Sequence, residues 1–336
     1  MAFPSPNPFP SLHRRACVVG AAALALSAAV PLAQAQQRGY PSHIITLVHP
    51  YAAGGSADAL ARGLAQQLEQ RLKISVIVEA KAGGAATIGT GFVARAKPDG
   101  YTLALSTSAG HVVTPLMQKI PYDGVEDFAF IAVVANQPNV LVVNPSLGID
   151  NVQTLIAQAK KDPSKFNFAS AGAGGATHLG AEAVWQRAGL KMTHVPYAGA
   201  APALKDLVGG QVQVAMLNVS ATLPLIEAGR IKALAYGAAQ RSPLLPNVPT
   251  LAEVGFAGAE VSTWYTLAAP KGTPPEVIET LRRAVAEANA DPAYQKLLAG
   301  QGAERMELSP AETTAFVRRD KENMSKLLET LNLLSR

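Results

Sequence analysis

Pro50-Tyr-Ala-Ala-Gly-Gly-Ser-Ala-Asp-Ala-Leu-Ala-Arg62 is the stretch that predicts the fold. The apolar run before it, Ile44–Val48, is typical of a buried strand, and Pro50 ends that strand because proline has no N–H to donate. Gly54 and Gly55 allow a tight turn and a close approach of a ligand to the backbone. The stretch therefore predicts a strand, a glycine turn and the start of a helix.

The residues after the two glycines predict a helix with one apolar face. Leu60, Leu64, Leu68 and Leu72 recur every fourth residue and fall on one side of it. Unpaired backbone N–H groups at the start of such a helix attract an anion. A Gly-Gly connection between a strand and a helix is also common for purely structural reasons, and the stretch taken alone favours that interpretation.

The composition of the 336-residue chain is that of a globular protein. It is 49% hydrophobic and 16% charged, with a mean hydropathy of +0.15, and its length suggests two domains. The net charge is +5, or +3 (27 basic and 24 acidic residues) without Arg14 and Arg15, which we expect to be removed. Because Lys and Arg form no cluster with interleaved aromatic residues, we expect no nucleic-acid partner.

Residues 1–35 are typical of an export signal. A pair of arginines supplies the positive start, the apolar run Ala16–Leu32 follows, and Ala33-Gln34-Ala35 is a small-x-small cleavage motif. We expect cleavage after Ala35 and a periplasmic mature chain, with Sec and twin-arginine export both open. Cys17, the only cysteine, would be lost with the signal, so we expect no disulfide.

Predicted strands and helices alternate in the next part of the chain. Apolar strands are predicted at Ile74–Val78, Tyr101–Leu105 and Phe128–Ala135, with a short helix between the first two. This alternation predicts a mainly parallel sheet with helices on both faces, whose ligands bind beyond the carboxyl ends of the strands. The Tyr51–Ser56 and Ser106–His111 loops would lie at that edge.

The strand–glycine–helix pattern recurs in what the sequence predicts to be a second lobe. Val140–Val143 is typical of a strand that carries the chain across. Phe166–Ser170 is a predicted strand, which Ala171-Gly-Ala-Gly-Gly175 connects to a helix from about Thr177 to Arg187. Two such units, one in each lobe, could then face each other across a cleft.

The chain is expected to return to the first lobe before its C-terminus. Val261–Leu267 is the predicted returning strand. We therefore expect residues 36–138 and 260–336 to form the first lobe and residues 139–259 the second.

Several helix boundaries carry capping signals. Asn151 is a predicted N-cap, Pro202 a predicted first helical residue and Gly209-Gly210 a predicted helix end. Thr273-Pro-Pro-Glu276 and Ser309-Pro-Ala-Glu312 each combine a hydroxyl N-cap, a proline at the first helical position and a glutamate at the third. Two final helices are expected to begin there.

Motifs of common enzymes are absent or incomplete. Ser108 and Ser170 lack the first glycine of G-x-S-x-G, and the loose G-x-G-x-x-A at Gly89 does not directly follow a predicted strand. The sequence has no G-x-x-x-x-G-K-[ST] loop and no H-E-x-x-H. Because no two histidines of the expected mature chain are four residues apart, we expect no metal site, and we expect no cofactor.

Individual polar residues at the predicted cleft have structural as well as functional interpretations. His111 and His178 are expected to be hydrogen-bonding wall residues. Asp58 is expected to complement the helix dipole rather than to act as a base. Tyr51 and Tyr197 could belong to the core or contact a ligand, and the sequence leaves both interpretations open.

Short motifs follow one another from about Tyr40 to the C-terminus. They include Pro50-Tyr-Ala-Ala-Gly-Gly-Ser-Ala-Asp58, Pro98-Asp-Gly-Tyr101, Pro138-Asn-Val-Leu-Val-Val-Asn-Pro145, Ala169-Ser-Ala-Gly172, His194-Val-Pro-Tyr197, Gly209-Gly-Gln-Val212 and Val248-Pro-Thr250. In this order they resemble the Bug family, the extracytoplasmic solute receptors of tripartite tricarboxylate transporters. The resemblance implies a two-lobed α/β periplasmic-binding-protein fold of type II, with crossing hinge strands, that closes on a small organic carboxylate.

The resemblance also implies a set of binding positions. In that family, backbone and hydroxyl groups of the first glycine loop hold a carboxylate, partly through ordered water. The implied ligand-binding residues are Tyr51, Gly55, Ser56, Thr107 and His111 in the first lobe, and Ser170, Ala171, Gly174, Thr177, His178, Tyr197 and Asn218 in the second.

Two positions depart from the family pattern. Ala57 stands where the family often has Thr, which removes a hydroxyl near the anion loop. Leu217-Asn218 stands where the family often has Asp-Asn. The missing carboxylate argues against an amino-acid ligand, whose ammonium group needs a negative partner, so we expect a neutral or aromatic acid.

The expected function is that of a periplasmic receptor and not of an enzyme. It would act as a monomer that captures a small organic carboxylate and delivers it to the membrane permease subunits of a transporter. One alternative is a periplasmic hydrolase of similar fold that uses Ser56 or Ser170 with His111 or His178. Another is a receptor that signals through a membrane sensor, which the sequence does not separate from transport.

Overall fold

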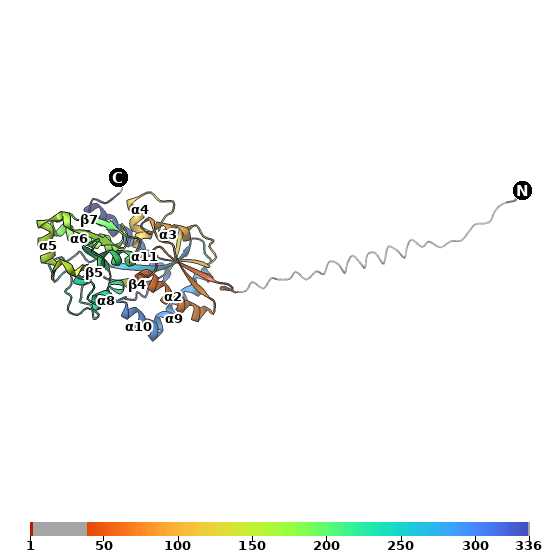
Figure 1. Cartoon of the computed structure of the whole chain (residues 1–336). Helices are drawn as coiled ribbons and strands as arrows, with labels where there is room; N and C mark the ends of the chain where they lie inside the picture. Colours follow the sequence, from red (N-terminus) through yellow and green to blue (C-terminus); the bar gives the residue numbers. More distant parts are fainter. Residues whose placement is uncertain (3–38, 335–336) are drawn as a thin grey trace. The chain divides into compact units, whose positions relative to one another are not determined.

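Two five-stranded sheets organise the chain in the computed structural model (Figure 1). The structure describes residues 1–2 and 39–334, so the predicted export signal and its cleavage site lie outside the described residues, apart from Met1 and Ala2. The first sheet has the order β2-β1-β3-β10-β4, formed by β1 (Ile45–His49), β2 (Val76–Ala80), β3 (Thr102–Thr107), β4 (Phe128–Gln137) and β10 (Thr263–Pro270). The second has the order β7-β6-β8-β5-β9, formed by β5 (Asn139–Val143), β6 (Asn167–Ser170), β7 (Thr193–Pro196), β8 (Val214–Asn218) and β9 (Lys232–Tyr236).

In each sheet, four strands run in one direction and one runs against them. β10 is antiparallel to β3 and β4 in the first sheet, and β5 is antiparallel to β8 and β9 in the second. The remaining pairs, around β1 and β6, are parallel. These antiparallel strands, β5 and β10, are the ones along which the chain passes from one sheet to the other. β5 follows β4 after Pro138, and β10 follows the long connection after β9. The predicted fold class, two mainly parallel sheets joined by crossing strands, is confirmed.

Helices cover both faces of each sheet, as predicted. They are α2 (Ser56–Leu72), α3 (Thr87–Ala94), α4 (Thr114–Met117), α5 (Val152–Lys161), α6 (Ala176–Ala188), α7 (Ala200–Val208), α8 (Val219–Glu227), α9 (Pro275–Ala290), α10 (Pro292–Gly300) and α11 (Pro310–Thr330). In the first sheet, α2, α9 and α10 pack on one face and α3 and α11 on the other. In the second, α5 and α6 pack on one face and α7 and α8 on the other.

The predicted apolar face of α2 is confirmed. Leu60, Leu64 and Leu68 are at most 2% exposed and belong to the core beneath the first sheet, with Leu72 packed at its margin. In Figure 1, α9 and α10 lie beside α2, although they come from the other end of the chain.

Two of the predicted helix starts are confirmed in detail. The Ser309 side chain accepts a hydrogen bond from the Glu312 N–H, and the Glu312 side chain accepts one from the Ser309 N–H, which completes a capping box. The Asn151 side chain accepts a hydrogen bond from the Thr154 N–H at the start of α5.

Two other predicted starts are wrong. Thr273 does not cap α9, because its hydroxyl donates to the Pro270 carbonyl at 2.7 Å and the helix begins one residue later, with Pro274 as the N-cap and Pro275 in the first turn. Pro202 is the third residue of α7 and not the first. The sequence also missed α8 and α10, so three final helices replace the two expected.

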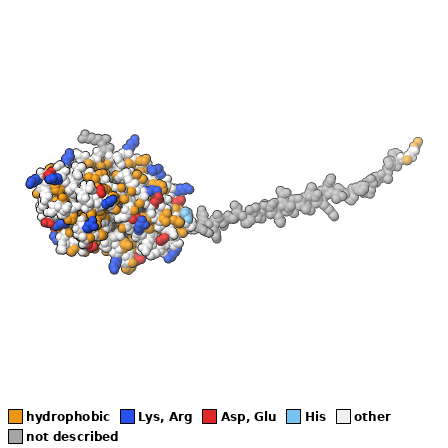
Figure 2. All heavy atoms as spheres, in the orientation of Figure 1, with side chains coloured by type: hydrophobic (Ala, Val, Ile, Leu, Met, Phe, Trp, Pro, Cys, Tyr) orange, Lys and Arg blue, Asp and Glu red, His pale blue; other side chains and the backbone are white. Residues whose placement is uncertain are grey.

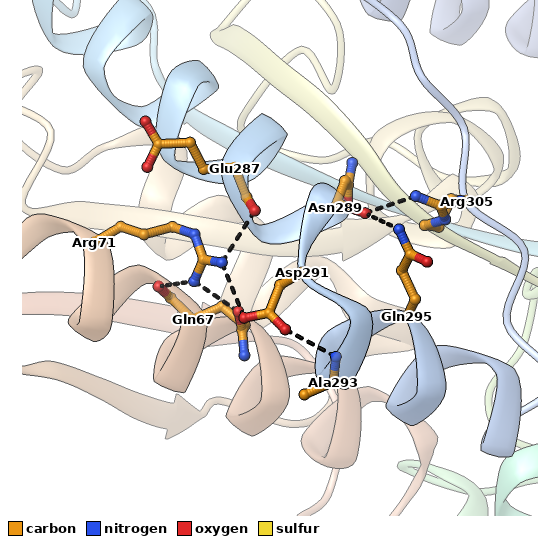
Figure 3. A network of polar contacts seen from close by, with 8 residues as sticks. All are labelled: Gln67, Arg71, Glu287, Asn289, Asp291, Ala293, Gln295 and Arg305. Carbon is orange, nitrogen blue, oxygen red and sulfur yellow. Dashed lines mark hydrogen bonds and ion pairs between the residues drawn. The ribbon is translucent and has the colours of Figure 1, made fainter.

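A polar network joins the C-terminal end of α2 to the junction of α9 and α10 (Figure 3). Arg71 donates to the Glu287 carbonyl at 3.0 Å and to the Asp291 carboxylate at 3.2 Å. Asp291 ends α9 and begins α10, where its other carboxylate oxygen accepts the Ala293 N–H at 2.8 Å. The network therefore fixes α2 against helices that lie more than 200 residues further along the chain.

Charged side chains are scattered over the face of the molecule that Figure 2 shows, where Lys and Arg form no single patch. In residues 1–2 and 39–334, no helix combines the length and apolar character that crossing a membrane requires.

Gly124 has no space for a side chain. A Cβ there would overlap the His111 carbonyl group, and the His111 ring donates from Nδ1 to the Gly124 carbonyl at 2.8 Å. Because neither backbone segment can move without breaking this packing, we expect Gly124→Ala to lower the free energy of unfolding by about 2–3 kcal/mol, measured by urea denaturation. Gly300→Ala is the matched control, since nothing lies within 4 Å of its Cβ position. Equal losses in the two variants would contradict the prediction.

Candidate functional site

A cavity lies between the two sheets, at the edge where their parallel strands end. Its empty space is about 550 Å³ with the solvent at its opening included, and the enclosed room for water-sized molecules within it is about 30 Å³. The part of the chain that carries the first sheet contributes Tyr51, Ala52, Gly55, Ser56, Ala57, Ala85, Thr107, Ser108, Ala109, Thr263 and Tyr265. The part that carries the second contributes Ala171, Gly172, Ala173, Gly175, Ala176, Thr177, Ala200 and Asn218.

Four helices begin at this cavity, and none of them has a side-chain cap. They are α2, α6, α7 and α8, whose N-caps are Gly55, Gly175, Gly199 and Asn218. By contrast, α5, α10 and α11 begin elsewhere and are capped by Asn, Asp and Ser side chains, although α3, α4 and α9 also lack a side-chain cap. The first N–H groups of a helix need partners and carry partial positive charge, so the four starts make the cavity suitable for an anion.

Two hydroxyl groups at these helix starts are available as donors. Ser56 is 3% exposed, and its Oγ has no hydrogen-bond partner among the described residues. Thr177 Oγ1 accepts the Ala171 N–H at 3.1 Å, which leaves its own O–H free to donate. A buried hydroxyl without a partner costs free energy, so the Ser56 side chain indicates a missing acceptor in the cavity.

The cavity wall carries no formal charge. Among its lining residues there is no Lys, Arg, His, Asp or Glu. Tyr51 donates or accepts a hydrogen bond with Thr107 Oγ1 at 2.6 Å, and burial raises the pKa of its hydroxyl to about 12, so it stays neutral. Any negative ligand charge would therefore be balanced by backbone dipoles and hydroxyl groups.

A hydrogen-bond network connects the cavity to the two crossing strands. Tyr265 of β10 donates to Asn218 Oδ1 at 3.4 Å, and Asn218 donates to Asn139 Oδ1, the first residue of β5, at 3.0 Å. Thr263, the first residue of β10, donates to the same oxygen at 3.3 Å. Residues that line the cavity thus hold the beginnings of both crossing strands.

The glycine loops of the two halves touch each other beside the cavity. The Ala52 N–H donates to the Ala198 carbonyl at 2.7 Å. Gly199 has φ +146°, and a Cβ there would lie 3.0 Å from the Ala52 nitrogen, so this close approach depends on glycine. The two halves therefore contact each other directly beside the cavity.

Seven of the twelve predicted binding residues line the cavity. They are Tyr51, Gly55, Ser56, Thr107, Ala171, Thr177 and Asn218. The other five, His111, Ser170, Gly174, His178 and Tyr197, lie outside its lining.

His111 lies in the core and not on the cavity wall. The expected Ser106–His111 loop does not form, because β3 continues to Thr107 and the chain then turns through a π-helical segment, Ala109–Val113. This turn places the His111 ring 4.7 Å from the Phe128 ring, where burial lowers the pKa of the imidazole to about 4.

Ser170 and His178 lie beneath the second glycine loop. Ser170 is fully buried and shares a hydrogen bond of 2.7 Å with His194 Nε2, not with either predicted histidine. His178 accepts the Gly174 N–H through Nδ1 at 3.1 Å, and its ring stacks on His194 at 3.9 Å. Both side chains therefore support the loop from below.

Gly174 and Tyr197 face away from the cavity. A Cβ on Gly174 would lie 3.1 Å from Val113 and 3.2 Å from Met117, so this residue abuts the other half of the molecule. Tyr197 donates from its hydroxyl to Asp206 at 2.8 Å.

The predicted hydrolase pairs do not form. Ser56 has no partner among the described residues, and the only histidine that bonds Ser170 is His194, whose pKa burial lowers to about 3. Within residues 1–2 and 39–334, no group of three His, Cys, Asp or Glu side chains is arranged to hold a metal ion.

Several lining residues were missed from the sequence. Thr263 and Tyr265 come from the returning strand, whose position was expected but whose cavity-facing residues depend on its register against β3 and β4. Ala85 and Ser108 come from loops that follow β2 and β3. Ser108 could have been predicted from the sequence, because it directly follows Thr107, a predicted binding residue at a strand end.

Asp58 holds the first glycine loop in shape. Its Oδ2 accepts the Gly54 N–H at 3.0 Å and Arg62 Nε at 3.1 Å, and its Oδ1 lies 3.2 Å from His49 Nε2. Burial raises the pKa of Asp58, but the hydrogen bonds from Arg62 and Gly54 outweigh burial, so the pKa lies below its usual value. Asp58 thus positions the loop without lining the cavity.

Comparison with known proteins identifies this architecture. The family model described as "Tripartite tricarboxylate transporter family receptor" matches residues 60–333. Protein BugT of Bordetella pertussis is 39% identical over 280 residues, which cover 83% of this chain and 86% of BugT.

Solved structures of similar proteins share the whole fold. Periplasmic binding protein BugD is 34% identical with a TM-score of 0.85, covering 88% of this chain and 100% of BugD. An R. palustris protein solved with adipate is 34% identical with a TM-score of 0.84, covering 87% and 98% of the two chains. MatC from Rhodopseudomonas palustris with bound malate is 27% identical with a TM-score of 0.82, covering 86% and 100%.

We expect Asp58→Asn to lower the free energy of unfolding by about 1.5 kcal/mol at pH 7, because hydrogen bonds to an ionised carboxylate are stronger than those to an amide. A depressed pKa stabilises the folded state above the unfolded pKa and loses that effect as pH falls through the folded pKa. The difference between wild type and variant should therefore begin to fall near pH 4, and it should vanish only when the pH is below the lowered folded-state pKa of Asp58. Urea denaturation at several pH values measures it.

Asp150→Asn serves as the control, since the side chain of Asp150 is 76% exposed and pairs with Lys232 at the surface. We expect this variant to change stability by less than about 0.5 kcal/mol at every pH. A loss in Asp58→Asn that persisted at acid pH would contradict the role given to the carboxylate.

Proposed function

Because the chain belongs to the family of tripartite tricarboxylate transporter receptors, we propose that it captures a small organic carboxylate in the periplasm and delivers it to membrane permease subunits. The observation that carries this proposal is the convergence of four helix starts without side-chain caps on one neutral cavity. A bound carboxylate would supply an acceptor for Ser56 and for N–H groups of these helix starts, apart from the Val219 N–H of α8, which donates to the Pro138 carbonyl.

The free energies of anion binding at helix starts and of hydrogen bonds favour binding of a charged ligand in a cavity that has no charged side chain. An anion at one helix start gains roughly 0.3–1 kcal/mol at an exposed site and up to about 2 kcal/mol in a partly buried one. Hydrogen bonds to a charged group contribute about 1.5–3 kcal/mol each. Several of each, in a cavity closed by contact between the halves, are sufficient for specific capture.

Relatives with known ligands support the choice of a carboxylate. The adipate and malate bound by two similar proteins are both organic acids, and their chains superpose on this one over most of its length. The absence of an acidic residue from the cavity lining supports the expectation of a neutral or aromatic acid rather than an amino acid.

The proposed receptor consists of two lobes that close on the ligand. We assign residues 36–138 and 260–336 to the first lobe and residues 139–259 to the second, after removal of residues 1–35 as an export signal. The two sheets fall on either side of these boundaries, and β5 and β10 cross between them. The network around Asn139 and Asn218 is the proposed hinge connection. Delivery to a permease rests on family membership alone.

We expect the purified protein to bind an organic acid with one-to-one stoichiometry and without turnover. Isothermal titration calorimetry, after a thermal-shift screen of organic acids, measures this. Ser56→Ala should weaken binding of the best acid by about tenfold or more, because the variant loses a hydrogen bond to a charged group. The matched control is Ser106→Ala, which removes a buried hydroxyl that bonds Thr90 at 2.7 Å outside the cavity lining.

Two outcomes would contradict the proposal. One is the absence of binding to any acid in a broad panel. The other is hydrolysis of an ester panel that is lost in Ser170→Ala, since the Ser170–His194 hydrogen bond would then act in catalysis rather than in loop support.

A further inference from the structure

The cavity wall at Ser108 differs from the other walls in its hydrogen bonding. Ser108 directly follows β3 and is 6% exposed. Its Oγ donates to Asp320 Oδ2, on α11, at 2.5 Å. Ser108 lines the cavity and Asp320 does not. A carboxylate therefore lies one hydrogen bond behind an otherwise uncharged wall.

This arrangement leaves Ser108 with acceptor capacity only. A serine hydroxyl has one donor and two acceptor sites, and its one donor is committed to Asp320. An ionised carboxylate is itself an acceptor only, so it cannot return a proton to the hydroxyl. Burial raises the pKa of Asp320, and the hydrogen bond from Ser108 opposes that rise. Ser56 and Thr177 differ from Ser108, because each still has an O–H to donate to a ligand.

One small ligand can reach both Ser56, which can donate a hydrogen bond, and Ser108, which can only accept one. The Ser56 loop follows β1 and Ser108 follows β3, and these two strands are parallel neighbours in the first sheet. Neighbouring strands lie about 4.8 Å apart. A molecule whose carboxylate is held at Ser56 therefore presents a nearby part of its body to Ser108.

Resting on the carboxylate-receptor function proposed above, we propose that Ser108 and Asp320 select acids that also carry a neutral hydrogen-bond donor, above all a hydroxyl group. A hydroxyl would donate to Ser108 Oγ. A second carboxylate at this wall would accept no hydrogen bond from Ser108 Oγ, whose proton is donated to the carboxyl group of Asp320. An ammonium group would find no carboxylate among the lining residues.

The test compares matched acids with the full mature chain by isothermal titration calorimetry. The panel contains butyrate, its 2-, 3- and 4-hydroxy derivatives, succinate and 4-aminobutyrate, and a second panel repeats the series on hexanoate. At least one hydroxy acid should bind about tenfold more tightly than its unsubstituted parent, and more tightly than the dicarboxylate and the amino acid of the same length.

Two variants separate this wall from the rest of the site. Ser108→Ala should abolish the advantage of the hydroxy acid over its unsubstituted parent, because the acceptor for the hydroxyl group is lost. Asp320→Asn should reduce the advantage, since an amide can donate to Ser108 and release its hydroxyl proton. Ser106→Ala should preserve the advantage in full. Thermal melts without ligand confirm that each variant is folded, and Asp320→Asn provides the test if Ser108→Ala is not.

The outcomes distinguish the two proposals. If plain acids bind but no hydroxy acid has an advantage, or if the advantage survives in Ser108→Ala, the inference about this wall is overturned and the receptor function stands. Preference for the dicarboxylate or the amino acid would overturn the inference too. If no acid of either panel or of the broad screen binds, the receptor proposal fails and the inference fails with it.

Discussion

Helix starts without side-chain caps are the constraint on which the site depends. The N–H groups of the first turn must find partners, and in α5, α10 and α11 an Asn, Asp or Ser side chain provides one. At the cavity, glycine precedes α2, α6 and α7, and the Asn218 side chain is engaged elsewhere. These starts surround one volume that both halves share. Asp58 fixes the loop before α2, and the Arg71–Asp291 network fixes the other end of that helix.

The crossing strands connect this shared volume to the link between the halves. β5 and β10 are the strands that run against their sheets, and their first residues, Asn139 and Thr263, share one hydrogen-bond network with cavity residues. Beside the cavity, Ala52 and Ala198 form a direct backbone hydrogen bond between the halves. In the proposed receptor, a ligand would therefore bind next to the residues that link the halves.

The sequence predicts well what depends on local pattern. The leucine face of α2, the capping box at Ser309 and the alternation of strands and helices all follow from spacing, and the structure confirms them. The strand ends expected from the sequence also include much of the cavity lining. Local pattern does not determine which way a side chain faces once the chain turns. His111 follows a strand end as expected, yet the π-helical turn after β3 directs it into an aromatic core.

Contacts between distant segments account for the remaining differences. Tyr265 reaches the cavity because β10 pairs with both β3 and β4, a register that no short stretch specifies. Ser108 and Asp320 are more than 200 positions apart, and only the packing of α11 brings them together. Thr273 carries a regular N-cap signal, but a carbonyl three residues earlier takes its hydroxyl first. For Tyr265 and Ser108 a contact between distant segments decides the outcome, whereas for Thr273 one local hydrogen bond replaces another.

Eight of the nineteen residues around the cavity are alanine, and this has a consequence for how such a receptor can diversify. In the proposed receptor, N–H groups of the helix starts would hold the acid group, and most substitutions do not remove main-chain atoms. Each alanine is a position where a single base change can add volume or polarity and leave those N–H groups in place. Under the proposed function, receptors for differently substituted acids would therefore arise from this scaffold by single substitutions at these alanines.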